Sequence, residues 1–274
     1  MNPIIRVFPR RTSHTPTDDM VFIGNPPLML PSGDEVHVSC AFTWDTKRAL
    51  LLADAWRQYY STVKVSGPAF DDFAGEFTPG LYVREGITTT SRGCNHQCPW
   101  CFVPKREGRL RELAIKPGYI LQDNNLLQCS RPHLERVFAM CRQQKHAVSF
   151  PGGFEAALVS DWVAGELRSL RIGEIWLAAD HDAALRPLEK AVHKLHWLPR
   201  RKLRCYVLIG YDGEAIADAE ARLRAVWDVG VLPFAQLYRD ADNSIRWPYE
   251  WRQLARTWSR PAAMFALMKQ ATRR

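Results

Sequence analysis

From Gly86 onward, short β-rich runs alternate with longer stretches whose apolar residues recur at helical spacing. The β-rich runs begin at Gly86, Gly118, Ala147, Glu174, Leu203 and Leu232. Amphipathic stretches such as "RPHLERVFAMCRQQ" and "EAIADAEARLRAVWDVG" separate them. Strands alternating with helices predict an α/β fold with a parallel sheet. Because six units are too few to close an eight-stranded barrel, we expect a partial (βα)6 barrel of the TIM type.

Polar or glycine residues follow each of the six predicted strands. In chain order these are the cysteine loop after the first strand, Asp123-Asn124-Asn125, Gly152-Gly153, Asp180, Gly210 and Tyr238-Arg239. The carboxyl ends of parallel strands share one face, and ligands bind there in α/β folds. The sequence therefore predicts a ligand site built from these strand ends.

The loop after the first predicted strand contains a cluster of three cysteines. It reads "SRGCNHQCPWCFVPKREG" and places Cys94, Cys98 and Cys101 within eight residues, with no fourth cysteine nearby. The chain has seven cysteines, an odd number that argues against a closed set of disulfides. We interpret the four scattered ones as small buried apolar residues: Cys40, Cys129, Cys141 and Cys205.

Three clustered thiolates favour a metal centre. Structural zinc takes four ligands, usually as two close pairs, and His96 is awkwardly spaced to complete a tetrahedron with all three cysteines. A zinc site completed by a distant ligand stays an alternative. A cubane iron–sulfur cluster usually takes four cysteines, so three would leave one iron open to an outside ligand.

The spacing Cys94-x3-Cys98-x2-Cys101, with the aromatic Trp100 before the last cysteine, resembles the radical S-adenosylmethionine superfamily. The resemblance implies a 4Fe–4S cluster held by the three cysteines, with the amino and carboxylate groups of S-adenosylmethionine on the fourth iron. An electron from an external one-electron reductant, such as flavodoxin or ferredoxin, would cleave S-adenosylmethionine. The resulting 5′-deoxyadenosyl radical would abstract hydrogen from the substrate.

The resemblance also implies roles for residues at later strand ends. Gly152, Gly153 and Glu155 resemble the family's Gly-Gly-Glu stretch that receives the methionine amino group, although Phe154 separates glutamate from the glycines here. A tight turn before a helix is the alternative. Asp180 matches the residue that binds the ribose hydroxyls, with a helix N-cap as the alternative.

Four further residues complete the predicted site. Trp100 and Gly210 are expected near the adenine, although Trp100 also fits simple hydrophobic cover. Tyr238 and Arg239 are candidates for the substrate pocket and for catalysis, and a structural hydrogen bond would explain them equally well.

The N-terminal segment predicts a small separate unit. "VHVSCAF", a helical stretch from Asp45 to Tyr60 and "TVKVSGPAF" predict a βαβ subdomain. Within the superfamily the chain resembles methylthiotransferases and members with a cobalamin module, but the Asp-x-His-x-x-Gly cobalamin motif is missing, so no cobalamin is expected. We expect an N-terminal arm and subdomain over 1–80, the partial barrel over 81–245 and a C-terminal helix over 246–274.

The net charge and the hydropathy of the chain indicate which kinds of molecule it can bind. The net charge of +8 suits an anionic partner, so a nucleic acid and a small molecule or peptide stay open as substrates. No apolar run approaches the roughly 18 residues of a membrane helix, and no signal peptide is evident. We expect a cytoplasmic protein with no membrane partner. The non-enzymatic alternative is a catalytically silent interaction protein that binds iron–sulfur or zinc.

Overall fold

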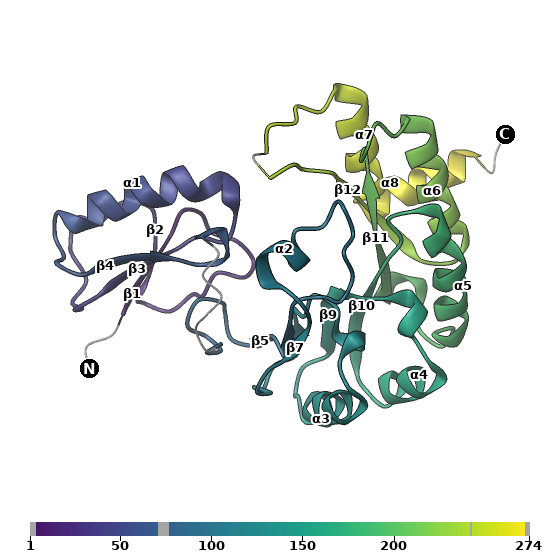
Figure 1. Ribbon diagram of the computed structural model, residues 1–274, viewed down its shortest axis with the longest axis horizontal. Coiled ribbons are helices and arrows are strands. Elements are labelled where there is room, and N and C mark those ends of the chain that lie inside the picture. Colours follow the sequence, from purple (N-terminus) through teal and green to yellow (C-terminus); the bar gives the residue numbers. More distant parts are fainter. Residues whose placement is uncertain (1–3, 71–76, 242, 272–274) are drawn as a thin grey trace. The chain divides into compact units, whose positions relative to one another are not determined.

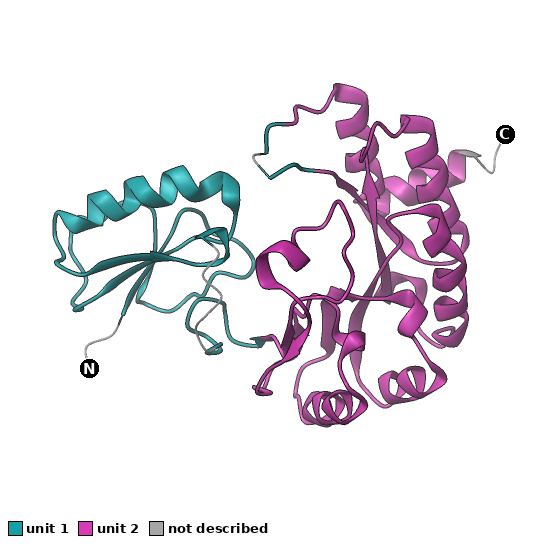
Figure 2. Ribbon diagram, in the orientation of Figure 1, with its two compact units in different colours: residues 1–87, 239–244 teal, residues 88–238, 245–274 magenta. Residues whose placement is uncertain are grey.

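The computed structural model describes residues 4–70, 77–241 and 243–271. The chain forms two compact units, coloured separately in Figure 2. The first comprises residues 1–87 and 239–244, and the second comprises residues 88–238 and 245–274. The sequence had placed the first boundary at residue 80 and had assigned residues 239–244 to the barrel.

The first unit contains a four-stranded parallel sheet with the order β2-β1-β3-β4. Its strands are β1 (Ile5–Phe8), β2 (Val21–Ile23), β3 (Val36–Ser39) and β4 (Val63–Ser66). Helix α1 (Thr46–Arg57) connects β3 to β4, in the region where the βαβ pattern was predicted. Trp56 of α1 is fully buried, and its indole N–H donates to the Gly24 carbonyl. The short helices η1 (Thr43–Asp45) and η2 (Pro68–Phe70) flank α1 and β4.

The second unit contains a six-stranded sheet with the order β12-β11-β10-β9-β8-β5. Its strands are β5 (Ile87–Thr88), β8 (Ile120–Leu121), β9 (Val148–Phe154), β10 (Ile172–Ala178), β11 (Leu203–Ile209) and β12 (Leu232–Leu237). Neighbours from β8 to β12 pair in parallel. The predicted α/β fold with a parallel sheet is confirmed. The strand order follows the chain order, so each helical connection joins neighbouring strands.

Four helices connect these strands and lie together on one side of the sheet (Figure 1). They are α3 (Arg131–Arg142), α4 (Asp161–Arg168), α5 (Leu185–Lys194) and α6 (Ile216–Asp228). Hydroxyl caps start two of them: Ser130 accepts from the His133 N–H, and Ser160 accepts from the Val163 N–H. The short helices η3 (Leu126–Gln128), η4 (Ala156–Leu158), η5 (Asp182–Ala184) and η6 (Arg200–Lys202) lie in the connections.

The C-terminal segment differs from the single helix that was predicted. It forms α7 (Tyr249–Trp258) and α8 (Pro261–Ala271). Proline lacks the N–H that would continue the first helix, but it is well tolerated at the first position of a new one. Pro261 therefore divides the segment.

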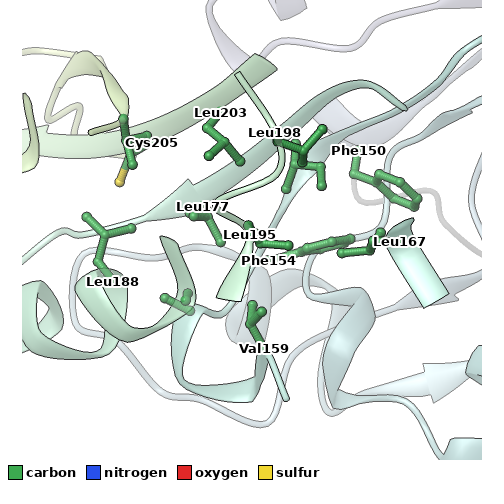
Figure 3. Packing of buried hydrophobic residues seen from close by; sticks show 14 of the residues in the cluster. Phe150, Phe154, Val159, Leu167, Leu177, Leu188, Leu195, Leu198, Leu203 and Cys205 are labelled. Atoms are coloured by element: carbon green, nitrogen blue, oxygen red, sulfur yellow. The ribbon is translucent and has the colours of Figure 1, made fainter. Parts of the chain in front are cut away.

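The core of the second unit lies between the sheet and its helices. Along β11, Leu203, Cys205, Val207 and Ile209 alternate as buried residues with partly exposed ones. Figure 3 shows Cys205 and Leu203 among Leu177, Leu188 and other apolar side chains.

The scattered cysteines are buried and free, as predicted. Burial raises the pKa of Cys129 to about 11 and that of Cys141 to about 12. Within the described ranges, the helices are all too short or too polar to cross a bilayer.

Candidate functional site

The cysteine loop is held at its ends by a short hairpin. β6 (Ser91–Arg92) pairs antiparallel with β7 (Arg111–Glu112), and α2 (Val103–Glu107) lies between them. The Cys94 N–H donates to the Gly108 carbonyl at 3.2 Å, and the Cys101 N–H donates to the Cys98 carbonyl at 3.0 Å. Backbone hydrogen bonds therefore close both the loop and the turn that contains the last two cysteines.

Glu107 fastens the base of this loop to the end of β8. Its carboxylate accepts from the Gly93 N–H at 3.2 Å and from the Asn124 amide at 2.6 Å. Arg92 also pairs with Glu107. Gly93 has a φ of +81°, and a Cβ there would lie 2.3 Å from the Arg109 carbonyl oxygen, so only glycine fits this close approach.

The three loop cysteines are free and half-buried. Burial raises the pKa values of Cys98 and Cys101, and the nearby charges of Cys94 and Asp180 raise them further. The three sulfurs and Asp180 therefore share one electrostatic neighbourhood. Thiols with raised pKa values are protonated at neutral pH, so a bound metal must displace their protons.

Cysteine thiolates are the donors that ligate iron–sulfur groups, so the residue types of this loop suit such a group, but their arrangement in the described part of the chain does not form a metal site. Across residues 4–70, 77–241 and 243–271, no three or more His, Cys, Asp or Glu side chains are grouped so that they could hold a metal ion.

Glu155 reaches the site through an irregularity in β9. Phe150 pairs with Ile175, and Phe154 pairs with Leu177. Between these two pairs β9 advances by four residues while β10 advances by two. The extra residues bend the strand at Gly152 and Gly153. Phe154 then turns into the core, where it is 2% exposed and its ring centroid lies 4.9 Å from that of Phe150. The residue that separates Glu155 from the glycines is thus accommodated in the core.

The Glu155 carboxylate accepts from three side chains. Its Oε2 lies 2.8 Å from His96 Nε2, 3.0 Å from Asn125 Nδ2 and 3.1 Å from Gln128 Nε2. Burial acts to raise the pKa of Glu155, but the hydrogen bonds from His96, Asn125 and Gln128 outweigh it and lower the pKa. Glu155 is therefore an ionised carboxylate at neutral pH.

Gln128 joins this carboxylate to the cysteine loop. Its side-chain oxygen accepts from the Asn95 N–H at 2.8 Å, while its amide donates to Glu155. Sequence reasoning missed Gln128 and His96 as partners of Glu155. Asn125 was placed at the correct strand end but given no role.

Asp123 is a buried acid beneath the glycines of β9. Its Oδ1 accepts from the Thr90 N–H, the Thr90 hydroxyl and the Ser91 hydroxyl at 2.7–2.8 Å. Its Oδ2 has no hydrogen-bond partner in the described part of the chain. Burial raises the pKa of Asp123 despite the three hydrogen bonds. A Cβ at Gly152 would lie 2.1 Å from the Asp123 carbonyl oxygen, so Gly152 permits this contact.

Asp180 follows β10 and is held at the site. The Leu208 N–H of β11 donates to it at 2.9 Å, and the Trp100 side chain hydrogen-bonds to it. Burial raises the pKa of Asp180. The N-cap residue of the following short helix is His181, which makes no side-chain cap. Asp180 therefore connects β11 to the cysteine loop and is not a helix N-cap.

Aromatic rings line the neighbouring strand ends. The Trp100 ring centroid lies 5.5 Å from that of Tyr211 and 6.0 Å from that of His181. The Tyr211 centroid lies 4.9 Å from that of Tyr238. The structure thus brings two predicted site residues, Trp100 and Tyr238, into one row of rings.

Gly210 and Arg239 differ in their surroundings from the other candidates. Gly210 has a φ of +79°, and a Cβ there would lie 2.3 Å from the Trp247 ring, so the space beside it is filled by the chain itself. Trp247 also donates to the Tyr238 carbonyl at 2.9 Å. Arg239 belongs to the first unit, where its guanidinium lies 4.5 Å from the Trp44 ring centroid.

No model of a known protein family matches this chain, and no curated protein matches it. Function is therefore inferred from the side chains at the carboxyl ends of the strands.

Proposed function

We propose that this protein is a radical S-adenosylmethionine enzyme whose Cys94, Cys98 and Cys101 hold a 4Fe–4S cluster. The main support is that Glu155, an ionised carboxylate, is tied through His96 and Gln128 to the loop that carries the three free thiols. To bind the methionine end of S-adenosylmethionine, a site needs an open iron and a carboxylate beside it. The carboxylate accepts hydrogen bonds from the ammonium group. The six-stranded sheet would then be an open partial (βα)6 barrel.

Each side chain would contribute a defined contact. Glu155 would accept a hydrogen bond from the methionine ammonium. The side chains of His96, Asn125 and Gln128 already hold its carboxylate in place. Asp180 would accept from the ribose hydroxyls while Trp100 holds its carboxylate in place. Trp100 would cover the adenine and exclude water. When bound, the cluster and S-adenosylmethionine would supply a 5′-deoxyadenosyl radical for hydrogen abstraction.

Tyr238 lies in the same row of rings as Trp100 and would face the substrate. The net charge of +8 supports a nucleic acid or nucleotide substrate. The electron would come from an external reductant such as flavodoxin or ferredoxin, and the reaction would take place in the cytoplasm.

The test is anaerobic reconstitution with iron and sulfide, followed by dithionite and S-adenosylmethionine. The wild-type protein should release 5′-deoxyadenosine, and Cys98→Ala should release none. Cys40→Ala, which changes a buried cysteine of the first unit, is the matched control and should retain the activity. A protein that takes up zinc and never iron contradicts the proposal. A cluster that forms without ever cleaving S-adenosylmethionine favours the silent binding protein instead.

A further inference from the structure

Two hollows open on the helical side of the second unit. The first, of about 490 Å³, lies where α3 and α4 end and β9 and β10 begin. Its lining includes the cations Arg142, Lys145 and Arg171. The second, of about 700 Å³, lies between η4 and α5. Its lining includes the cations Arg186, Lys190 and Lys194 and the carboxylate of Glu189.

Positive charge is concentrated in these hollows. Together they are lined by six Lys or Arg residues and by one carboxylate, Glu189. The whole chain has 37 Lys or Arg and 29 Asp or Glu among 274 residues, so chance would place only about two cations and about two carboxylates among the lining residues. The connecting loops 143–147, 169–171 and 195–202 contain no Asp or Glu at all. This side of the unit therefore presents a cationic surface, which we define as the six cations of the two hollows.

Most of these cations are available to a ligand. Lys145, Arg171, Arg186 and Lys190 are exposed and form no ion pair within the described residues. Lys194 pairs with Asp161 at 3.2 Å, but the Asp161 side chain is 92% exposed, so this pair contributes little. Arg142 is held in place by Glu166 and Ser169. Four of the six cations are thus left without an ion pair among the described residues.

The cations of α5 form a row. Arg186, Lys190 and Lys194 are spaced four residues apart, so they lie on one face of the helix. The rise of 1.5 Å per residue places successive members about 6 Å apart along the axis. This spacing is comparable to that of neighbouring phosphates along an extended nucleic acid strand.

The two hollows adjoin opposite ends of α4: Ser169 in the first follows the last residue of the helix, and Val159 in the second precedes its first residue. Because the eight residues of α4 span about 12 Å along the helix axis, a single phosphate or a small anion cannot occupy both hollows. A chain of phosphates can. We propose that the cationic surface binds the sugar–phosphate backbone of a nucleic acid strand, which runs past α4 from one hollow to the other.

This strand would run toward the candidate site. The first hollow includes Val148, where β9 begins. The second includes Ala156, which directly follows Glu155 and lies just beyond the carboxyl end of β9. Backbone contacts of this kind position a strand without reading its sequence. The binding does not depend on the iron–sulfur cluster, so it can be tested separately from the proposed function.

The test is fluorescence anisotropy with the full-length, metal-free protein and labelled single strands of RNA and DNA of about 20 nucleotides, longer than a typical single-strand site. The affinity should fall steeply between about 50 and 200 mM salt. The triple variant Lys145→Glu, Arg171→Glu, Lys190→Glu should bind at least about tenfold more weakly. It should also lower the salt slope by about 2, because each single-strand phosphate contact contributes about 0.7.

The matched control is Arg252→Glu, Arg256→Glu, Lys269→Glu, which makes the same charge change at exposed positions of α7 and α8. It should weaken binding much less than the first variant. Both variants should keep the wild-type circular dichroism and melting temperature. Equal weakening by the two variants, or no binding at the lowest salt, overturns the proposal. Binding of poly-glutamate in preference to both nucleic acids also overturns it and indicates an acidic protein partner.

Discussion

His96 Nε2 lies 2.8 Å from Glu155 Oε2, which joins the cysteine loop to the end of β9. The two residues are far apart in the chain, and Gln128 and Asn125 support the same oxygen from a third segment. A carboxylate that accepts several hydrogen bonds is favoured in its charged form. The cysteine loop and the strand end that follows the two glycines are thus built around one anion.

The ionised Glu155 should be required for binding S-adenosylmethionine and not for assembling the cluster. Glu155→Gln keeps the shape and removes the charge. A hydrogen bond to a charged group contributes about 1.5–3 kcal/mol, so the affinity for S-adenosylmethionine should fall about 10- to 100-fold. Isothermal titration of the reconstituted protein measures this, and the iron content should be unchanged. Glu135→Gln, at an exposed ion pair on α3, should leave the affinity at the wild-type value.

Asp123 should make stability depend on pH. Burial raises its pKa, so the folded protein binds this proton more tightly than the unfolded chain does. Its contribution to the free energy of unfolding is therefore greatest below the unfolded value of about 4, and it is lost as pH rises through the raised folded value. Asp123→Asn has no such titration. Urea unfolding should show wild-type stability falling relative to the variant as pH rises above the unfolded value of about 4.

Asp161→Asn is the control for this pH series, because the Asp161 side chain is 92% exposed. Its stability should follow the wild-type curve throughout. A difference between wild type and Asp123→Asn that does not change with pH would mean that Asp123 is not the group responsible.

Gly210 should tolerate alanine less well than Gly213 does. Both have positive φ, at +79° and +71°, so alanine costs a similar backbone strain at each. At Gly210 the new Cβ would also lie 2.3 Å from the Trp247 ring, whereas nothing lies within 4 Å at Gly213. Overpacking of this kind costs about 1–3 kcal/mol. Gly210→Ala should therefore unfold at a lower urea concentration than Gly213→Ala. Equal midpoints would show that Trp247 can move aside freely.

The sequence predicted the α/β fold and the positions of its main strands in the chain because apolar periodicity and strand–helix alternation are local patterns. It also placed the cysteines, Glu155 and Asp180 at strand ends, since a parallel sheet brings its carboxyl ends together. It could not predict that the β9 irregularity turns Phe154 into the core, because such a bulge depends on pairing with β10.

Three other features were outside the reach of local patterns. Gln128 connects Asn95 to Glu155 through contacts between distant segments, and polar side chains of this kind have no periodic signal. Trp247 fills the space at Gly210 from the irregular stretch that precedes α7. Arg239 directly follows Tyr238 but belongs to the first unit, a division that depends on packing.

The central claim is that Cys94, Cys98 and Cys101 hold a cluster with one open iron. Electron paramagnetic resonance of the reconstituted and reduced protein tests it directly, with iron counted in the same sample. We expect about four irons per chain and a cluster signal that changes when S-adenosylmethionine is added, with both lost in each single cysteine-to-alanine variant. A cluster signal that S-adenosylmethionine leaves unchanged, or a full iron complement in any of the three variants, would contradict the account.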